Sequence, residues 1–280
     1  MAKSMNASYK RTGVLAGALV LLFLAAMIGG CGSSDTSKVM TVEERFAHAK
    51  ALFDDHDYLA AINDLTVITL QYQGSAIAPD AQFYLGECRY FREEYLLAAF
   101  EYSVVKRNYP ASPRVADAMY KTAMSYYNLS PKPALDQQYT RKAIDEFQSF
   151  VEYYPANANA PDAEAKIHDL TNRLAKKQYD TARLYGTMEY YRSALFYYDD
   201  VIEKYHDTEY APLAFISKVE LLISRNRYRE AAAETARFYE KYPNSVLRGR
   251  MDALKTSIDK ELPPPAVKTD TGSGGKGTGL

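Results

Sequence analysis

The side chains that most often carry chemistry are few and scattered in this chain. It has two cysteines, Cys31 and Cys88, and none of its four histidines lies at a spacing from them that would form a zinc or haem site. No nucleophile motif and no glycine-rich phosphate loop occurs. Paired acids such as Asp54 and Asp55 are typical of a solvated helix face. We therefore expect no metal, no cofactor and no enzymatic activity.

Cys31 stands directly after an apolar segment near the N-terminus. Three cations precede that segment, and residues 13–30 are apolar or small throughout. A short positive region followed by an apolar run is typical of a secretory signal peptide. The run ends in "IGGC", which resembles a lipobox: an aliphatic residue, two small residues and the cysteine. The resemblance implies cleavage after Gly30 and a covalent lipid on Cys31.

Two alternatives stay open for this segment. The run is about long enough to span a bilayer, so it could be a retained transmembrane anchor, or an ordinary signal in which the cysteine stands by chance. A lipoprotein cysteine carries more than one acyl chain, and several chains together hold a protein stably at a membrane. In Gram-negative lipoproteins, aspartate after the cysteine tends to retain the protein at the inner membrane. Gly32 stands there instead, so we expect the outer membrane.

The composition excludes one large class of partner. The formal net charge is −1 at pH 7, whereas a nucleic-acid surface needs a strong basic excess. The hydrophobic fraction of 47% allows a sizeable core. Tyrosine is frequent, with 25 residues, and tryptophan is absent. Because tyrosine has an apolar ring and a polar tip, this composition suits helix packing and exposed binding faces.

One spacing recurs five times between residues 41 and 261. An alanine is followed eleven residues later by a tyrosine, and three residues after the tyrosine comes serine, asparagine or threonine. These last residue types favour turns and helix N-termini. In three copies proline follows the tyrosine directly. The five pairs are Ala61/Tyr72, Ala98/Tyr109, Ala143/Tyr154, Ala194/Tyr205 and Ala231/Tyr242.

This pattern resembles the tetratricopeptide repeat, in which a small residue stands where two helices cross and proline follows the second helix. The resemblance implies an all-α fold, a right-handed solenoid of five helix pairs. Copy two places Gly86 and Ala98 at the crossing of its helices. Residues 129–139 ("LSPKPALDQQY") predict a loop within the third pair. Residues 162–185 predict one long helix joining repeats three and four.

The predicted domain order follows from these boundaries. Residues 1–30 form the signal peptide, and residues 31–40 a flexible polar tether. Residues 41–165 hold repeats one to three, and residues 166–261 hold repeats four and five. The remaining tail, residues 262–280, is rich in glycine and proline and has few apolar side chains. Such a segment cannot bury enough surface to offset its ordering entropy, so we expect disorder there.

Aromatic residues recur at two equivalent positions in the first helix of repeats one to three. Stacked repeats would place them as two rows in one groove, which could bind an extended or hairpin peptide with aromatic side chains. The alternative, that these rings pack between adjacent repeats, stays open because aromatic residues at helical spacing are usually core. In copy four the second position is Gly186. The candidate groove residues are Phe46, Phe83 and Tyr120 at the fifth position, and Phe53, Tyr90 and Tyr127 at the twelfth.

Taken together, the lipobox, tether and repeats resemble the BamD (ComL) family, the lipoproteins of the β-barrel assembly machine. The most specific stretches are residues 137–155 and 173–208. The resemblance implies a non-catalytic scaffold on the periplasmic side of the outer membrane that assists folding and insertion of outer-membrane proteins. Repeats one to three would bind unfolded outer-membrane proteins through their C-terminal aromatic signals. Repeats four and five, around residues 186–226, would bind BamA. Other lipoproteins of the machine are further candidate partners.

Two other functions are compatible with a lipid-anchored repeat protein. One is a pilot protein for a pilus or secretin, although pilot proteins usually lack the long helix expected before repeat four. The other is a regulator of a periplasmic cell-wall enzyme. The proteins that copurify with the chain would separate these possibilities.

Overall fold

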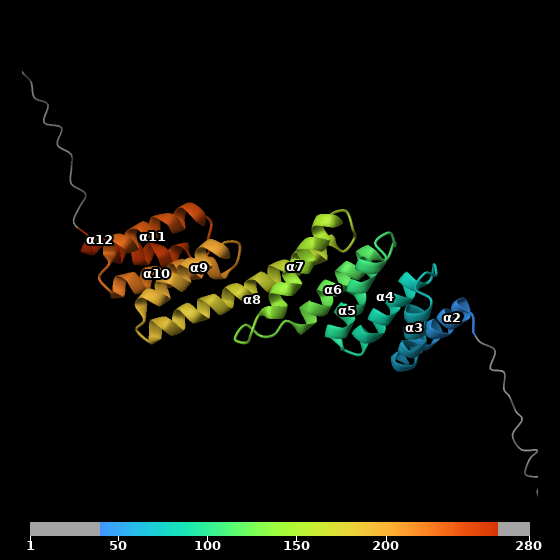
Figure 1. The fold of residues 1–280 in the computed structure, drawn as a ribbon. Helices are drawn as coiled ribbons and strands as arrows, with labels where there is room; N and C mark the ends of the chain where they lie inside the picture. Colours follow the sequence, from blue (N-terminus) through green and yellow to red (C-terminus); the bar gives the residue numbers. More distant parts are fainter. Residues whose placement is uncertain (1–39, 263–280) are drawn as a thin grey trace, which may run out of the picture. The chain divides into compact units, whose positions relative to one another are not determined.

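The computed structural model describes residues 40–262, which form a succession of α-helices without a strand in that range (Figure 1). The predicted signal peptide, Cys31, the tether up to residue 39 and the tail from residue 263 lie outside the described residues. The helices are α2 (Val42–Asp54), α3 (Tyr58–Gln71), α4 (Ala78–Phe91), α5 (Tyr95–Asn108), α6 (Val115–Leu129), α7 (Gln138–Tyr153), α8 (Ala160–Thr187), α9 (Tyr191–Lys204), α10 (Tyr210–Ser224), α11 (Tyr228–Lys241) and α12 (Arg248–Glu261).

The helices are arranged as consecutive pairs. From α3 onward each helix packs against the next one in the chain. In addition, α10 contacts both α8 and α12. The first pair is joined by side chains, because the Arg45 guanidinium and the His48 ring both contact the Asp64 carboxylate, at 2.7 and 2.6 Å. The all-α fold of helix pairs, implied by the resemblance to the tetratricopeptide repeat, is confirmed.

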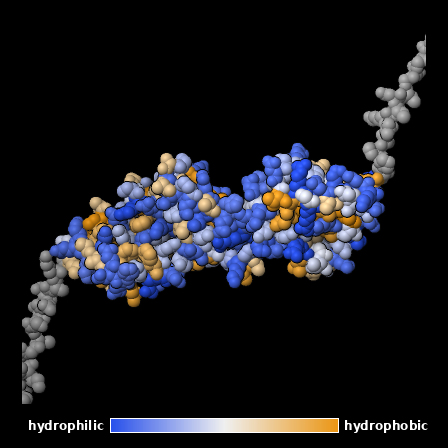
Figure 2. Space-filling view, turned by 180° about the vertical axis from the view of Figure 1, so that it is seen from behind, coloured by the Kyte–Doolittle hydropathy of each residue, from blue (hydrophilic) through white to orange (hydrophobic). Residues whose placement is uncertain are grey.

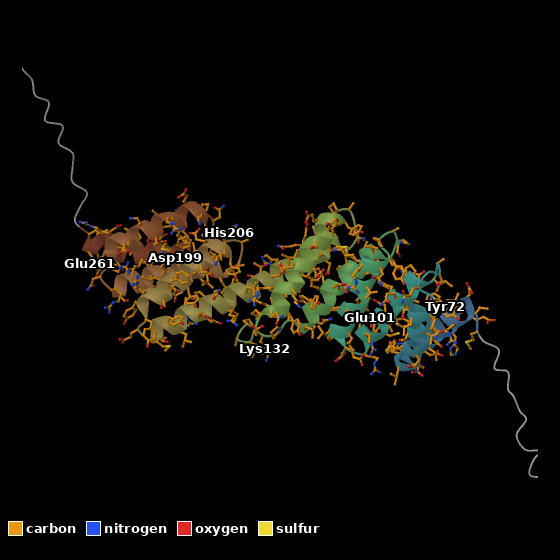
Figure 3. All side chains as sticks on the ribbon, in the orientation of Figure 1. Tyr72, Glu101, Lys132, Asp199, His206 and Glu261 are labelled. Carbon is orange, nitrogen blue, oxygen red and sulfur yellow. The ribbon has the colours of Figure 1, made fainter. Side chains whose placement is uncertain are left out.

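The recurrent alanines and tyrosines have the same structural roles in all five pairs. Every aligned alanine lies in the second helix of its pair and is fully buried. Every aligned tyrosine, including Tyr72 in Figure 3, is the capping residue directly after that helix. The amide of the predicted turn residue donates to the tyrosine carbonyl in each exit turn; for Ser75 the distance is 2.9 Å. The repeated spacing therefore marks the same helix end and the same exit turn in each of the five pairs.

The turn inside four of the pairs contains a non-glycine residue in the left-handed backbone region. Each such residue lies two positions before the tyrosine that begins the second helix. L-residues with a Cβ atom visit this region at an energetic cost, and asparagine tolerates it best. The four residues are His56, Glu93, Glu189 and Asn226, with φ between 57° and 65°.

The third pair has a longer connection, as the sequence predicts. Helix α6 ends at Leu129 and α7 begins at Gln138. The buried Gln137 amide donates to the carbonyl oxygens of Lys132 and Leu135, at 2.9 and 3.0 Å, which holds the loop together. Lys132 is labelled in Figure 3. Lys177 of α8 also donates to the Leu135 carbonyl, at 2.6 Å, so the loop is fixed to the long helix.

Helix α8 is 28 residues long and confirms the predicted continuous helix. Its Ala163 and Leu170 belong to the buried cluster formed with α4 to α7. Its Ala182 belongs to a different cluster, formed with α9 to α12. One rigid element thus takes part in two hydrophobic cores. The predicted division of the repeats at residue 165 stays a prediction, and the repeats from Arg45 onward belong to one compact unit.

A buried charge lies within the C-terminal core. The Lys218 side chain of α10 is only 8% exposed, and its ammonium contacts Asp199 of α9 at 2.5 Å and Glu234 of α11 at 2.8 Å. Asp199 is labelled in Figure 3. Because a buried cation requires partners to offset its lost hydration, this contact couples three helices. Helix α12 covers the end of the same core with Met251 and Ile258.

Candidate binding surfaces

The six candidate groove residues lie on the first helices of the first three pairs. Helices α2, α4 and α6 each carry two of them, seven residues apart. Seven residues are close to two helical turns, so both residues of a helix lie on one face. The structure thus places the predicted positions on the first helices of three successive pairs. Their role in peptide binding stays a prediction.

Phe83 differs from the other five because it is part of the core. It is 7% exposed, its ring lies 5.5 Å from the ring of Tyr102, and the Arg114 guanidinium covers it at 5.2 Å. Little of its surface is left for a ligand. For Phe83 the structure therefore favours the packing alternative over an open groove.

Two aromatic residues outside the predicted rows line the space between α2 and α4. Tyr84 meets Phe46 and Phe53 edge-to-face, at centroid distances of 5.8 and 5.4 Å. Phe91 lies 5.7 Å from Phe53 and remains 51% exposed. Tyr84 directly follows Phe83, and Phe91 directly follows Tyr90. Both would have been identified if the predicted binding face of α4 had been placed one residue later. The wall facing α2 is therefore formed by Tyr84 and Phe91 and not by Phe83.

Cations lie over several of these rings. The Lys50 ammonium is 5.2 Å from the ring centre of Tyr84, and the Lys121 ammonium is 4.9 Å from that of Tyr90. A cation within about 6 Å of a ring centre is attracted to the face of the ring. The Lys121 ammonium also contacts the Glu87 carboxylate at 2.9 Å. Aromatic surface and positive charge thus lie side by side on the first repeats.

Tyr120 and Tyr127 use their hydroxyls to fasten α6 to α8. The Tyr120 hydroxyl donates to Asp162 at 2.6 Å, and the Tyr127 hydroxyl donates to Asp169 at 3.0 Å. Burial, followed by these hydrogen bonds, raises the pKa of both phenols. Arg173 of α8 joins the second contact by donating to the Tyr127 hydroxyl at 3.2 Å. These two residues therefore support the packing alternative as well as the groove.

Glu87, which lies between the predicted rows, is also buried. Its carboxylate accepts a 2.5 Å hydrogen bond from the Tyr102 hydroxyl as well as the Lys121 contact. A carboxylate in this position needs such partners because it has lost most of its water. The residue thus stabilises the α4–α5–α6 packing, and the open part of the surface is aromatic and cationic.

Exposed apolar side chains gather in sequence where α8 ends and α9 begins. We name this set the α8–α9 patch; it consists of Leu184, Met188, Tyr190 and Phe196. Figure 2 shows apolar surface interrupting the hydrophilic exterior of the C-terminal repeats. Large apolar side chains that lie next to one another on a protein surface often mark an interaction site. Most of the patch lies within residues 186–226.

No group of three or more histidine, cysteine or acidic residues among residues 40–262 could hold a metal ion. Within the same range, no helix combines the length and the apolar character needed to cross a bilayer.

Comparison with known proteins finds relatives that share one name. The chain is 26% identical to the outer membrane protein assembly factor BamD of Rickettsia prowazekii, over 80% of this chain and 90% of that protein. It is 23% identical to the factor of the same name from Caulobacter vibrioides, over 91% of this chain and 85% of that protein. Among solved structures, the chain is similar to one in the TPR2AB-domain:pHSP90 complex of yeast Sti1, with 16% identity and a TM-score of 0.40. The match covers 78% of this chain and 83% of that chain.

The family match covers most of the described solenoid. The model of the YfiO family, described as an outer membrane lipoprotein, matches residues 38–236, from the end of the tether into α11. This range includes both helices of repeats one to four and the first helix of repeat five. The chain therefore belongs to the YfiO family of outer membrane lipoproteins.

Proposed function

We propose that this protein is a non-catalytic scaffold of the β-barrel assembly machine that assists the folding and insertion of outer-membrane proteins. The observation that carries the proposal is the continuous similarity to assembly factors named BamD, which reaches 90% of the Rickettsia prowazekii relative. The similarity includes the repeats and is not confined to the N-terminal signal. A scaffold role agrees with helix pairs that present aromatic and apolar side chains at two separate surfaces.

Repeats one to three would receive the unfolded substrate. Phe46, Phe53, Tyr84 and Phe91 form an aromatic lining between α2 and α4. Lys50 and Lys121 place positive charge beside aromatic rings. An outer-membrane protein segment that ends in an aromatic residue and a free carboxylate offers a matching apolar group and a matching charge.

Repeats four and five would bind BamA through the α8–α9 patch. Phe196 is 65% exposed, and its neighbour Tyr197 stacks on Tyr185 of α8 at a centroid distance of 5.3 Å. The stacked rings fix the relative position of α8 and α9, so the patch is presented on a rigid support. Exposed aromatic anchors on rigid elements are frequent energetic centres of protein interfaces.

The lipid on Cys31 would hold these surfaces on the periplasmic side of the outer membrane. Conversion of Cys31→Ser is expected to release the protein from the outer-membrane fraction, while its helix content stays unchanged. Fractionation followed by immunoblotting measures this. A Cys31→Ser protein that remains fully in the outer membrane would contradict the anchor.

Copurification tests the scaffold proposal as a whole. The tagged full-length chain is extracted with a gentle detergent, and the associated proteins are identified by mass spectrometry. We expect BamA with the unmodified chain, and loss of most BamA with Phe196→Asp. The matched control is Phe100→Asp, a similarly exposed phenylalanine of repeat two (55%), which should retain BamA. Secretin or pilus proteins in place of BamA would instead assign the chain to the pilot-protein alternative.

A further inference from the structure

A shallow cavity of about 340 Å³, widely open to solvent, lies between α8, α9 and α10. Its walls include Arg183 and Gly186 of α8, Tyr198 of α9, and Ser217, Glu220 and Leu221 of α10. The lining is mixed, with an aromatic ring, an aliphatic side chain and both signs of charge. Small concave sites with a few converging polar groups are typical ligand-binding sites.

Gly186, which has no side chain, forms part of the wall of this cavity. Gly186 occupies the twelfth position of its repeat, where the three earlier repeats have Phe53, Tyr90 and Tyr127. A Cβ atom added at Gly186 would find no other atom within 4 Å. The position is therefore open, and the ring that the earlier repeats place there is missing.

Tyr127 shows which contacts such a ring makes. Its ring packs against Phe147 of the second helix in its own pair, at a centroid distance of 6.4 Å. Its hydroxyl donates to Asp169 of the following helix at 3.0 Å. The environment of this twelfth-position tyrosine thus includes one aromatic ring and one carboxylate, besides the Arg173 guanidinium that also donates to its hydroxyl.

Repeat four retains both of these groups without the tyrosine. Tyr198 follows the aligned Ala194 by four residues, as Phe147 follows Ala143. Glu220 follows the exit Tyr205 by fifteen residues, as Asp169 follows Tyr154. Tyr198 and Glu220 both line the cavity. The cavity thus has two of the partners that Tyr127 uses and lacks the tyrosine side chain itself.

One charged side chain at the cavity can still accept a hydrogen bond from a ligand. One oxygen of Glu220, Oε1, accepts from Arg250 at 2.7 Å, whereas Oε2 has no hydrogen-bond partner among residues 40–262. Arg183 has no ion pair within that same range; its guanidinium lies 6.0 Å from the ring centre of Tyr179. The Ser217 hydroxyl is already engaged with the hydroxyl of Tyr179, at 3.0 Å. Glu220 is accordingly the available acceptor.

We propose that this cavity binds a tyrosine side chain of a partner polypeptide. The ring would lie between Tyr198 and Leu221, and the phenol hydroxyl would donate to Glu220, as Tyr127 donates to Asp169. A hydrogen bond to a carboxylate favours tyrosine over phenylalanine, because charged acceptors form the stronger hydrogen bonds. The site is separate from the aromatic lining of repeats one to three, and the inference does not depend on which polypeptide supplies the tyrosine.

The test uses the isolated full-length chain and a defined probe, N-acetyl-L-tyrosinamide. In an NMR titration, we expect shifted amide signals at Gly186, Ser217 and Leu221. N-acetyl-L-phenylalaninamide should bind on the order of tenfold more weakly, since it lacks the hydroxyl that a charged acceptor recognises. Equal binding of both probes, or shifts confined to other repeats, would overturn the proposal.

Two variants make the test specific. Gly186→Tyr should fill the cavity from within and abolish probe binding, whereas the control Gly186→Ala should leave binding largely intact. Probe binding that persists in Gly186→Tyr would also overturn the proposal. Should Gly186→Tyr not fold, Glu220→Gln is the deciding variant. It should bring the ratio of the affinities for the tyrosine and phenylalanine probes close to one. BamA is absent from these measurements, so their outcome is independent of the copurification result.

Discussion

A Cβ atom added at Gly86 would lie 2.6 Å from Cδ1 of the Tyr102 ring. Gly86 of α4 and Tyr102 of α5 are both buried, and the Tyr102 ring occupies the space that a side chain at position 86 would need. The sequence predicts that Gly86 lies at the helix crossing. The structure shows that the Tyr102 ring leaves no room for a side chain at this position. The Tyr102 hydroxyl is in turn fixed by Glu87.

Replacement of Gly86 by alanine should therefore destabilise the fold. The new methyl group displaces a buried ring that is tied at its far end, and overpacking of this kind typically costs about 1–3 kcal/mol. Chemical denaturation followed by circular dichroism measures the change in the free energy of unfolding. The control is Gly249→Ala in α12, where an added Cβ meets nothing within 4 Å. Equal stability of Gly86→Ala and Gly249→Ala would contradict the close contact.

Cys88 should be unreactive in the folded protein. It is fully buried, and burial raises the pKa of its thiol to about 12. The thiolate is the reactive form. At pH 8, iodoacetamide should consequently modify Cys88 only when the protein unfolds, which peptide mass spectrometry in increasing denaturant can follow. Rapid modification without denaturant would show that the α4–α5 core opens readily.

The same pKa shift predicts loss of stability at alkaline pH. The unfolded thiol has a pKa near 9.0, below that of the folded thiol. As the pH rises through this interval, the unfolded state loses its proton first, so the free energy of unfolding falls between about pH 9 and 12 and is unaffected below. Cys88→Ala removes this contribution, and its stability should fall less steeply over the same interval. Identical slopes would contradict the prediction.

The left-handed turn residues predict a stabilising substitution. Glu189 has a φ of 63°, and it directly follows Met188, whose φ is −82°. Glycine adopts positive φ without the Cβ clash, so Glu189→Gly should raise the free energy of unfolding by about 0.5–1 kcal/mol after the entropy of the unfolded glycine is included. Met188→Gly only adds conformational entropy to the unfolded chain, so it should lower the free energy of unfolding. Thermal unfolding of the two variants distinguishes them by the sign of the change.

Local and repeated features of the fold were predictable from sequence. Five copies of one alanine–tyrosine spacing determine five buried crossings and five helix ends, and the absence of a breaker between residues 162 and 185 predicts α8. These signals lie within one helix pair and need no knowledge of distant contacts. Helix α12 was not recognised separately, although Met251, Leu254 and Ile258 follow the spacing of one helical face.

The candidate surface was predicted less completely, because helical spacing does not say which neighbour a ring meets. Phe83 turned out to face Tyr102 within its own pair, while Tyr84, one residue later, faces α2. The hydroxyl contacts of Tyr120 and Tyr127 join residues 42 positions apart. Such contacts depend on how one pair is rotated against the next, and that rotation is set by packing across the whole interface.

Peptide binding to repeats one to three gives the last prediction. Phe46→Ala combined with Tyr90→Ala removes two half-buried rings beside Lys50 and Lys121, so it should weaken binding of a synthetic peptide with a C-terminal phenylalanine more than it lowers the melting temperature. Fluorescence anisotropy measures the binding, and we expect a loss on the order of tenfold, as for hot-spot residues. Amidation of the peptide C-terminus should also weaken binding, because it removes the charge that the lysines would attract.

Phe83→Ala is the matched core variant for this experiment. It empties a buried site, and removal of a buried phenylalanine side chain costs about 3–5 kcal/mol. Its main effect should therefore be a lower melting temperature, with peptide affinity retained at a temperature where the variant is folded. The opposite pattern, in which the Phe46/Tyr90 double variant melts early but binds the peptide normally, would assign these rings to packing between repeats. The two variants together thus decide whether the aromatic positions bind a ligand or only support the solenoid.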